Sequence, residues 1–250
     1  MKVIIVTGTG TGIGKTITTA ALAACASRSG QRVAVVKPVQ TGVRPGEAGD
    51  LTDVERLTGL ADLHEYVRYA EPLAPATAAR RLGQEGPSTR ELVEWIGRLE
   101  GRDLIIVEGA GGAFVRYNTS NETIVDLALG LRAIAATLGV VVTTGAGLGA
   151  LHDAAAAAAA LAPLSVDNQL VVGRWPAVVG LAERCNLIDL PGYGSGTVQG
   201  VLPDGAGELS RSEFGDVAVR SLTRTLGGTF DASEFIRAHA APAATKVSYR

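Results

Sequence analysis

The chain has 250 residues, a formal net charge of −2 and two cysteines. A chain of this length can form one α/β domain with a sizeable core, so it needs neither disulfides nor structural metal for stability. The near-balanced charge indicates no basic face, and we expect neither nucleic acid nor a membrane surface as a partner.

Cysteine spacing and the N-terminal residues indicate a cytoplasmic protein. Cys25 and Cys185 form no Cys-x-x-Cys motif and lie in different segments, so we expect two unpaired thiols. The apolar run at the N-terminus is too short for the core of a signal peptide and passes directly into a glycine-rich loop. No segment has the roughly 18 consecutive apolar residues of a membrane-spanning helix.

Short apolar runs alternate with longer segments of helical pattern. The runs predict strands at residues 3–7, 33–37, 104–108, 140–144 and 170–173, with a weaker sixth at 198–202. The intervening segments predict helices at residues 16–29, 51–57, 74–82, 89–99, 124–131 and 151–161. Most of the strands are apolar throughout, which favours burial on both faces. We therefore predict a doubly wound, mostly parallel α/β sheet with helices on both faces, one domain over residues 1–239 and a frayed tail over residues 240–250.

A glycine-rich loop connects the first predicted strand to the first predicted helix, with the sequence Gly8-Thr-Gly-Thr-Gly-Ile-Gly-Lys15-Thr16. Glycines let backbone N–H groups surround a phosphate, and the N-terminus of the helix adds a partial positive charge. Lys15 can then contact the β- and γ-phosphates, and the Thr16 hydroxyl can bind Mg²⁺. Thr9 stands where the strict Walker A pattern has its first glycine, so the loop is a longer variant. The loop predicts binding of a nucleoside triphosphate.

Two charged residues end later strands and are expected at the same edge of the sheet. The second predicted strand ends at Lys37, which can stabilise charge on a transferring group. The third ends at Glu108, followed by Gly-Ala-Gly-Gly, and this carboxylate has the placement of a Walker B acid that binds Mg²⁺. Asp50 and Asp53 lie where a helix begins, and spacing alone does not decide which of them, if either, faces a metal rather than capping the helix.

Three motifs together resemble the dethiobiotin synthetase family of the P-loop NTPase superfamily. They read GTGTGIGKT at residues 8–16, KPVQTG at 37–42 and VEGAGG at 107–112, and the segment EPLAP at 71–75 is also similar. The resemblance extends over about residues 1–205. It implies Mg²⁺- and ATP-dependent carboxylation of 7,8-diaminononanoate with CO₂ to dethiobiotin. The route is a carbamate, then its mixed anhydride with phosphate, then closure to a cyclic urea.

The resemblance also implies roles for individual residues. It makes Thr16, Asp50 and Glu108 the Mg²⁺ ligands, Lys37 the catalytic lysine, and Lys15 and Thr11 contacts of the transferring phosphate. The expected nucleotide contacts are Gly12, Ile13, Gly14, Lys15, Thr16, Ile17, Gly173, Arg174, Leu202, Pro203 and Asp204. The expected substrate contacts are Thr41, Gly109, Ala110, Gly111, Gly112, Leu151 and His152. The family implies a homodimer whose substrate site lies at the subunit interface.

The chain departs from the family pattern in two places. Leu151-His152-Asp153 stands where the family usually has Asn-His, which changes the chemistry next to the substrate. The segment Gly173-Arg174-Trp175 lacks the asparagine that the family often uses to contact the nucleobase. Because an amide that favours adenine is missing, we expect relaxed base selectivity. A clear preference for ATP over CTP and GTP in binding or turnover would contradict this expectation.

Three other classes of P-loop protein are less consistent with the sequence. A partitioning-type switch ATPase usually has an additional lysine early in the loop, and Gly10 occupies that position. A metallochaperone GTPase requires a stretch rich in histidine and cysteine, but the chain has three histidines and two separated cysteines. A related amidoligase of cobalamin synthesis is the best enzymatic alternative, although no glutamine-hydrolysing domain follows.

Overall fold

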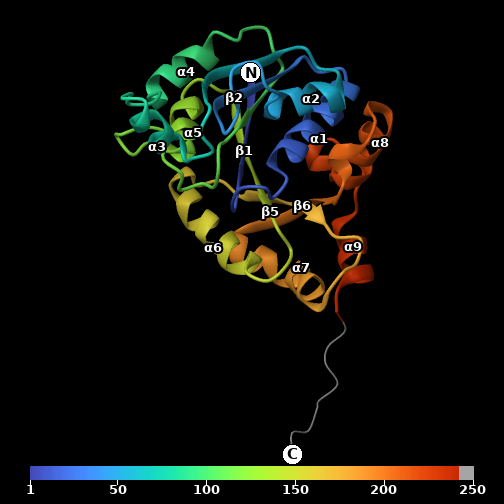
Figure 1. Cartoon of the computed structure of the whole chain (residues 1–250). Coiled ribbons are helices and arrows are strands. Elements are labelled where there is room, and N and C mark those ends of the chain that lie inside the picture. Colours follow the sequence, from blue (N-terminus) through green and yellow to red (C-terminus); the bar gives the residue numbers. More distant parts are fainter. Residues whose placement is uncertain (242–250) are drawn as a thin grey trace, which may run out of the picture.

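The computed structural model describes residues 1–241, which contain one seven-stranded parallel sheet in the order β3-β2-β4-β1-β5-β6-β7 (Figure 1). The strands are β1 (Lys2–Gly8), β2 (Val33–Thr41), β3 (Leu63–Tyr69), β4 (Leu104–Glu108), β5 (Thr137–Thr144), β6 (Asn168–Trp175) and β7 (Gly196–Pro203). The chain order reverses on the two sides of β1, as in other doubly wound sheets, and this confirms the predicted fold class.

Helices cover both faces of the sheet (Figure 1). One face packs against α1 (Lys15–Arg28), α2 (Asp50–Thr58) and α8 (Arg211–Ser221). The other face packs against α3 (Pro75–Arg81), α4 (Thr89–Gly97), α5 (Ile124–Arg132), α6 (Ala150–Leu161) and α7 (Leu181–Gly194). The last helix, α9 (Ala232–His239), lies against α7 and β7. Short 3₁₀ turns occur at Ala162–Leu164, Ala206–Glu208 and Arg224–Leu226.

The side chains of the central strands alternate between two hydrophobic cores. In β1, Val3 and Ile5 contact the core under α5, whereas Ile4 and Val6 contact the core under α1. Both sets are buried, which confirms that the uniformly apolar runs are strands covered on both sides. The carboxyl ends of these strands all meet one edge of the sheet, and the loops that follow them form the functional site.

The strand predictions were wrong at β2 and β3. The second strand continues past Lys37 to Thr41, because Lys37 to Thr41 pair with β3 after the pairing with β4 has ended at Val36. Pro38 is tolerated there because it lies beyond the β4 ladder and between the residues paired with β3. The edge strand β3 is only half-buried and contains charged residues, so a search for fully apolar runs does not find it.

The structure also contains α7, α8 and α9, which the sequence pattern did not predict. Proline and two glycines in the last turn of α7 obscure its helical pattern. In contrast, α8 begins with a capping box from Ser210 and Glu213, a signal that the sequence does contain. None of the helices within residues 1–241 is long and apolar enough to cross a membrane. Most of the tail predicted at residues 240–250 lies outside the described residues.

Candidate functional site

A cavity of about 680 Å³ lies at the carboxyl ends of β1, β2 and β4. The loop between β1 and α1 forms one wall, and the start of α2 forms another. The end of β6 and the segments after β3, β4 and β7 complete the rim. Segments far apart in the sequence therefore converge where the parallel sheet presents the ends of its strands.

The phosphate loop is closely packed against β6. Gly14 has a positive φ of 95°, and a Cβ atom at this position would lie 2.5 Å from the Gly173 carbonyl oxygen. Glycine is therefore required at this point by both conformation and space. The loop passes into α1 at Lys15, so the first amides of the helix face the cavity and can bind an anion.

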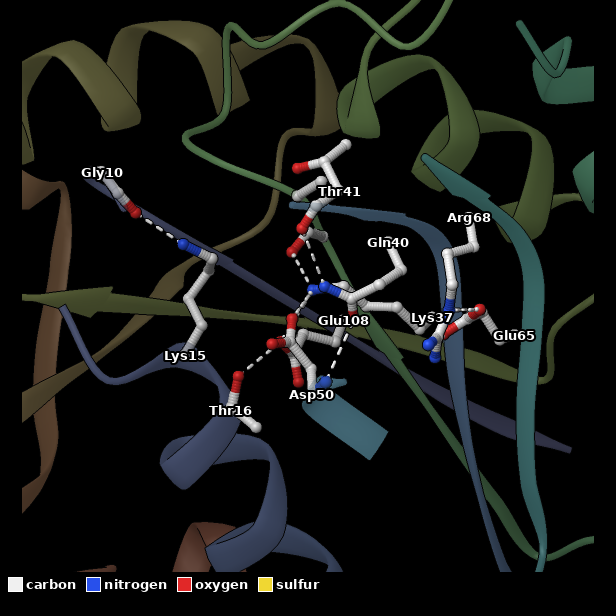
Figure 2. A network of polar contacts seen from close by, with 12 residues as sticks. Gly10, Lys15, Thr16, Lys37, Gln40, Thr41, Asp50, Glu65, Arg68 and Glu108 are labelled. Carbon is white, nitrogen blue, oxygen red and sulfur yellow. Dashed lines mark hydrogen bonds and ion pairs between the residues drawn. The ribbon is translucent and has the colours of Figure 1, made fainter. Parts of the chain in front are cut away.

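Lys15 extends back over this loop, and its Nζ donates a hydrogen bond of 2.5 Å to the Gly10 carbonyl (Figure 2). Its side chain is largely buried. Burial, with a further contribution from the nearby Lys37 charge, lowers the pKa of Lys15 to about 8. A bound polyanion would supply the opposite charge that this lysine lacks.

Lys37 lies at the centre of a buried polar cluster together with Thr16, Asp50 and Glu108 (Figure 2). Its Nζ is 2.5 Å from Asp50 Oδ2 and 2.9 Å from Glu108 Oε1, and it also donates to the Gly109 carbonyl at 3.2 Å. The Thr16 hydroxyl donates to the same Glu108 oxygen at 2.9 Å. Helices α1 and α2 and strands β2 and β4 thus each contribute one side chain to the cluster.

The electrostatics of this cluster favour a charged lysine. Burial opposes the charge on Lys37, but the Glu108 and Asp50 carboxylates outweigh it and raise the pKa of Lys37 above its ordinary value. Burial likewise acts to raise the pKa of Asp50, and the charge of Lys37 outweighs it, so the pKa of Asp50 is lowered. The opposing shifts of Lys37 and Asp50 therefore favour an ion pair between these two residues.

The donor set of this cluster fits Mg²⁺. Among the described residues, Glu108 Oε2 is buried and has no hydrogen-bond partner, which leaves a carboxylate oxygen available for a ligand. No group of three or more His, Cys, Asp or Glu side chains suited to a metal occurs in residues 1–241. Two carboxylates and a hydroxyl match the way Mg²⁺ is held in phosphate-transfer sites, where the substrate phosphates and water complete its shell.

The structure distinguishes the two aspartates that spacing left open. Asp50 is the first residue of α2, and Gly49 rather than Asp50 is the N-cap, so the carboxylate of Asp50 is free to contact Lys37. Asp53 borders the cavity, but its carboxylate pairs with Arg56 at 2.9 Å. Asp50 is therefore the aspartate that lies in the cluster.

The opposite end of the cavity is bridged by Arg174. Its guanidinium is 3.0 Å from Asp204 and donates to the Gly12 carbonyl at 3.2 Å, which connects the phosphate loop to the segment after β7. Gly173, Arg174, Pro203 and Asp204 all line the cavity.

Most of the predicted site residues line this one cavity. Besides those described above, Thr11, Gly12, Ile17, Thr41, Ala110 and Gly111 also border it. Ile13, Gly109, Gly112 and Leu202 lie in the same segments but do not line it. Leu151 and His152 do not line it either, because they lie in the first turn of α6, where His152 is exposed.

Several cavity residues were not predicted. Gln40 and Val39 in β2, Val115, and the turn at Gly205–Glu208 line the cavity, as do Pro72–Pro75 of the EPLAP segment. The buried Tyr117 lies behind the loop after β4, and its hydroxyl accepts a hydrogen bond from the Ala110 amide at 3.4 Å. Only the EPLAP segment carried a signal in the sequence, since the others are ordinary residues placed by the fold.

The chain is similar in sequence to proteins of known family. Residues 2–172 match the family described as an AAA domain. The chain is 54% identical to the ATP-dependent dethiobiotin synthetase BioD of Frankia casuarinae, over 94% of this chain and 98% of that protein. Proteins of the same name from Parafrankia sp. and Streptomyces avermitilis are 48% and 45% identical. These two alignments cover 96% and 95% of this chain and 100% and 99% of the relatives.

Two solved structures are similar in fold. A ParA family ATPase from Chlorobium tepidum has a TM-score of 0.54 over 90% of this chain and 95% of its own. The MinC:MinD cell division protein complex of Aquifex aeolicus has a TM-score of 0.50, over 98% and 99%. Both are 13% identical to the chain, so they show the fold alone. The sequence relatives extend over almost the full length at much higher identity, and by that measure the chain belongs to the dethiobiotin synthetase family of ATP-dependent ligases.

Proposed function

We propose that the chain uses ATP to carboxylate 7,8-diaminononanoate with CO₂ and to close the product to dethiobiotin. The observation that supports this proposal best is the buried Lys37, held between Asp50 and Glu108 next to a phosphate loop. The name of the relatives indicates ATP-dependent synthesis of dethiobiotin, and the cavity contains two lysines and oxygen ligands suited to it.

The proposed chemistry has three steps. One amine of the substrate attacks CO₂ and loses a proton to form a carbamate. A carbamate oxygen then attacks the γ-phosphorus of ATP, the bond to ADP breaks, and a carbamic–phosphoric anhydride forms. Finally the second amine attacks the carbamate carbon, releases phosphate and loses a proton, which closes the cyclic urea. Phosphorylation turns a poor leaving oxygen into a good one, so the protein contributes mainly position and charge.

Charged residues in the cavity suit these steps. Lys15 and Lys37 would stabilise negative charge on the transferring phosphoryl group, which develops between the carbamate and ADP. Thr16, Asp50 and Glu108 would hold Mg²⁺, which when bound neutralises phosphate charge. Thr41, Ala110 and Gly111 border the cavity and would contact the diamine acid.

A homodimer would explain where Leu151 and His152 act. These two residues lie outside the cavity of their own chain. Leu148, at 94% exposure, lies just before the same helix and leaves an apolar surface uncovered. A second copy packed on this surface would bring the first turn of α6 toward the partner's cavity, and the substrate site would then lie at the subunit interface.

Incubation of the protein with diaminononanoate, ¹³C-bicarbonate, Mg²⁺ and ATP tests the proposal directly. Mass spectrometry should detect the cyclic urea with one additional mass unit from the labelled carbon, together with ADP and phosphate in equal amounts. A reaction without ATP should give no product. Release of ADP without the labelled urea would refute the proposed substrate, although ATP hydrolysis itself would remain.

A further inference from the structure

The side chain of Gln40 is buried in β2, where it lies close to the Lys37 cluster but belongs to none of its ion pairs (Figure 2). Its exposed fraction is 4%, and it makes two hydrogen bonds. The side-chain amide donates to the Thr41 carbonyl at 3.1 Å, and its oxygen accepts from the Asp50 backbone amide at 3.0 Å. Gln40 therefore connects the end of β2 to the first residue of α2.

This contact occupies the first amide of α2. The first amides of a helix have no partner within the helix, and a side chain at the N-cap usually accepts one of them. The N-cap of α2 is Gly49, which has no side chain. A Cβ atom there would lie 3.0 Å from Arg68 Nη2 and 3.1 Å from Gln40 Oε1, so the site has little space for a capping side chain. The Thr52 amide bonds the Gly49 carbonyl at 2.9 Å, and Gln40 accepts the first amide of the helix, that of Asp50, from a neighbouring strand.

Arg68 holds the preceding loop from the other side. Its guanidinium donates to the Glu47 carbonyl at 2.7 Å and to the Arg44 carbonyl at 3.2 Å. Glu65 fixes the same guanidinium through contacts of 2.7 and 2.8 Å (Figure 2). Arg68 thus holds the loop before α2 at Arg44 and Glu47, and Gln40 binds the backbone of the residue that follows the loop, Asp50.

We propose that Gln40 is a positioning residue that sets how tightly the site holds a divalent cation with its nucleotide. It acts through Asp50, because its bond fixes the backbone from which that carboxylate extends toward Lys37 and Glu108. Groups that orient metal ligands without touching the metal typically change affinity or activity by about 10–100-fold when they are removed. This inference depends on the proposed role of Asp50 as a metal ligand.

The test uses Gln40→Met, which keeps the length and volume of the side chain but removes both hydrogen bonds. Binding of Mn²⁺ to the complex with ADP is followed by electron paramagnetic resonance, and binding of ADP alone is measured in EDTA. We expect the affinity for Mn²⁺ to fall about 10-fold while the affinity for metal-free ADP stays within about twofold of the parent value. Gln169→Met, in β6, is the matched control and should leave both affinities unchanged.

Two further variants separate the possible outcomes. Asp50→Asn should weaken Mn²⁺ binding at least as much as Gln40→Met; if it has no effect, the proposed metal site itself is wrong. If Asp50→Asn weakens Mn²⁺ binding and Gln40→Met does not, Gln40 has no positioning role. An equal loss of Mn²⁺ and ADP binding would show a general structural role and would also overturn the proposal. Should Gln40→Met not fold, Gln40→Asn serves instead, and parental Mn²⁺ affinity in that variant overturns the proposal.

Discussion

At the scale of single residues, the environment of Lys37 determines what that lysine can do. Two carboxylates within 3 Å keep it charged although it is almost completely buried. A lysine held in this way is suited to act as a fixed positive charge rather than as a base, because it has no tendency to lose its proton near neutral pH. Its expected contribution is therefore to the transition state of phosphoryl transfer.

Replacement of Lys37 by alanine tests this contribution. We expect Lys37→Ala to retain nucleotide binding, because Lys15 and the loop amides remain, and to lower kcat by about 10²–10³-fold, the usual loss of one transition-state charge partner. Steady-state rates and the Kd for the nucleotide measure the two effects separately. Lys2→Ala, at the exposed start of β1, is the control. An unchanged kcat would remove Lys37 from the mechanism.

The residues of this cluster differ in how well the sequence predicts them. Lys37 and Glu108 are predictable because each is a charged residue directly after a buried apolar run. The choice of Asp50 over Asp53 is not predictable from spacing, since it depends on the cap position and on the pairing of Asp53 with Arg56. Gln40 gives no signal, because its function lies in a contact with a helix start ten residues later.

At the scale of elements, the phosphate loop is held by its contact with β6. A Cβ atom at Gly173 would lie 2.2 Å from the Ile13 carbonyl oxygen and 2.4 Å from Thr143 Cγ2. The backbone of β6 thus forms the surface on which the loop rests. Any side chain at this position must displace the loop, whose amides are arranged to bind phosphate.

We therefore expect Gly173→Ala to weaken nucleotide binding. Overpacking costs about 1–3 kcal/mol, which corresponds to about 5–150-fold in affinity if it falls entirely on the loop. Calorimetric titration with ADP and Mg²⁺ measures the change. Gly192→Ala, in α7, is a matched control, because a Cβ atom there meets nothing within 4 Å. Parental affinity in Gly173→Ala would show that the loop does not depend on β6.

Strands were predictable from the sequence where an apolar run marks burial on both faces of the sheet. The apolar runs at the centre of the sheet are buried on both faces, and the predicted strands lie within β1, β2, β4, β5 and β6, although β2 continues to Thr41. The edge strand β3 was missed because most of its residues are only half-buried and some are charged. Among them, Glu65 and Arg68 form an ion pair. The extension of β2 was missed because it exists only through pairing with that same strand.

At the scale of the whole molecule, three large apolar side chains near the starts of α6 and α7 are exposed. Leu148, Val178 and Leu181 are 94%, 89% and 72% exposed, and they lie in the segments that lead into α6 and α7. Asn186 of α7 donates to the carbonyls of Ala146 and Gly147, which connects α7 to the segment before α6. Exposed aliphatic residues gathered in this way are typical of a protein interface.

A charge in this surface should therefore separate the proposed dimer. We expect Leu148→Glu to shift the mass measured by light scattering from two chains toward one, because burial of an unpaired carboxylate in an apolar interface is unfavourable. The separated chains should still bind nucleotide, since the cavity is formed within one chain, but should lose most of their turnover if α6 of the partner completes the substrate site. Tyr66→Glu, on β3 at the opposite edge of the sheet, should change neither property. If the Leu148→Glu protein keeps the mass and turnover rate of the parent, the interface lies elsewhere. If the parent protein is monomeric at the concentration used for the assay, a substrate site shared between subunits is excluded.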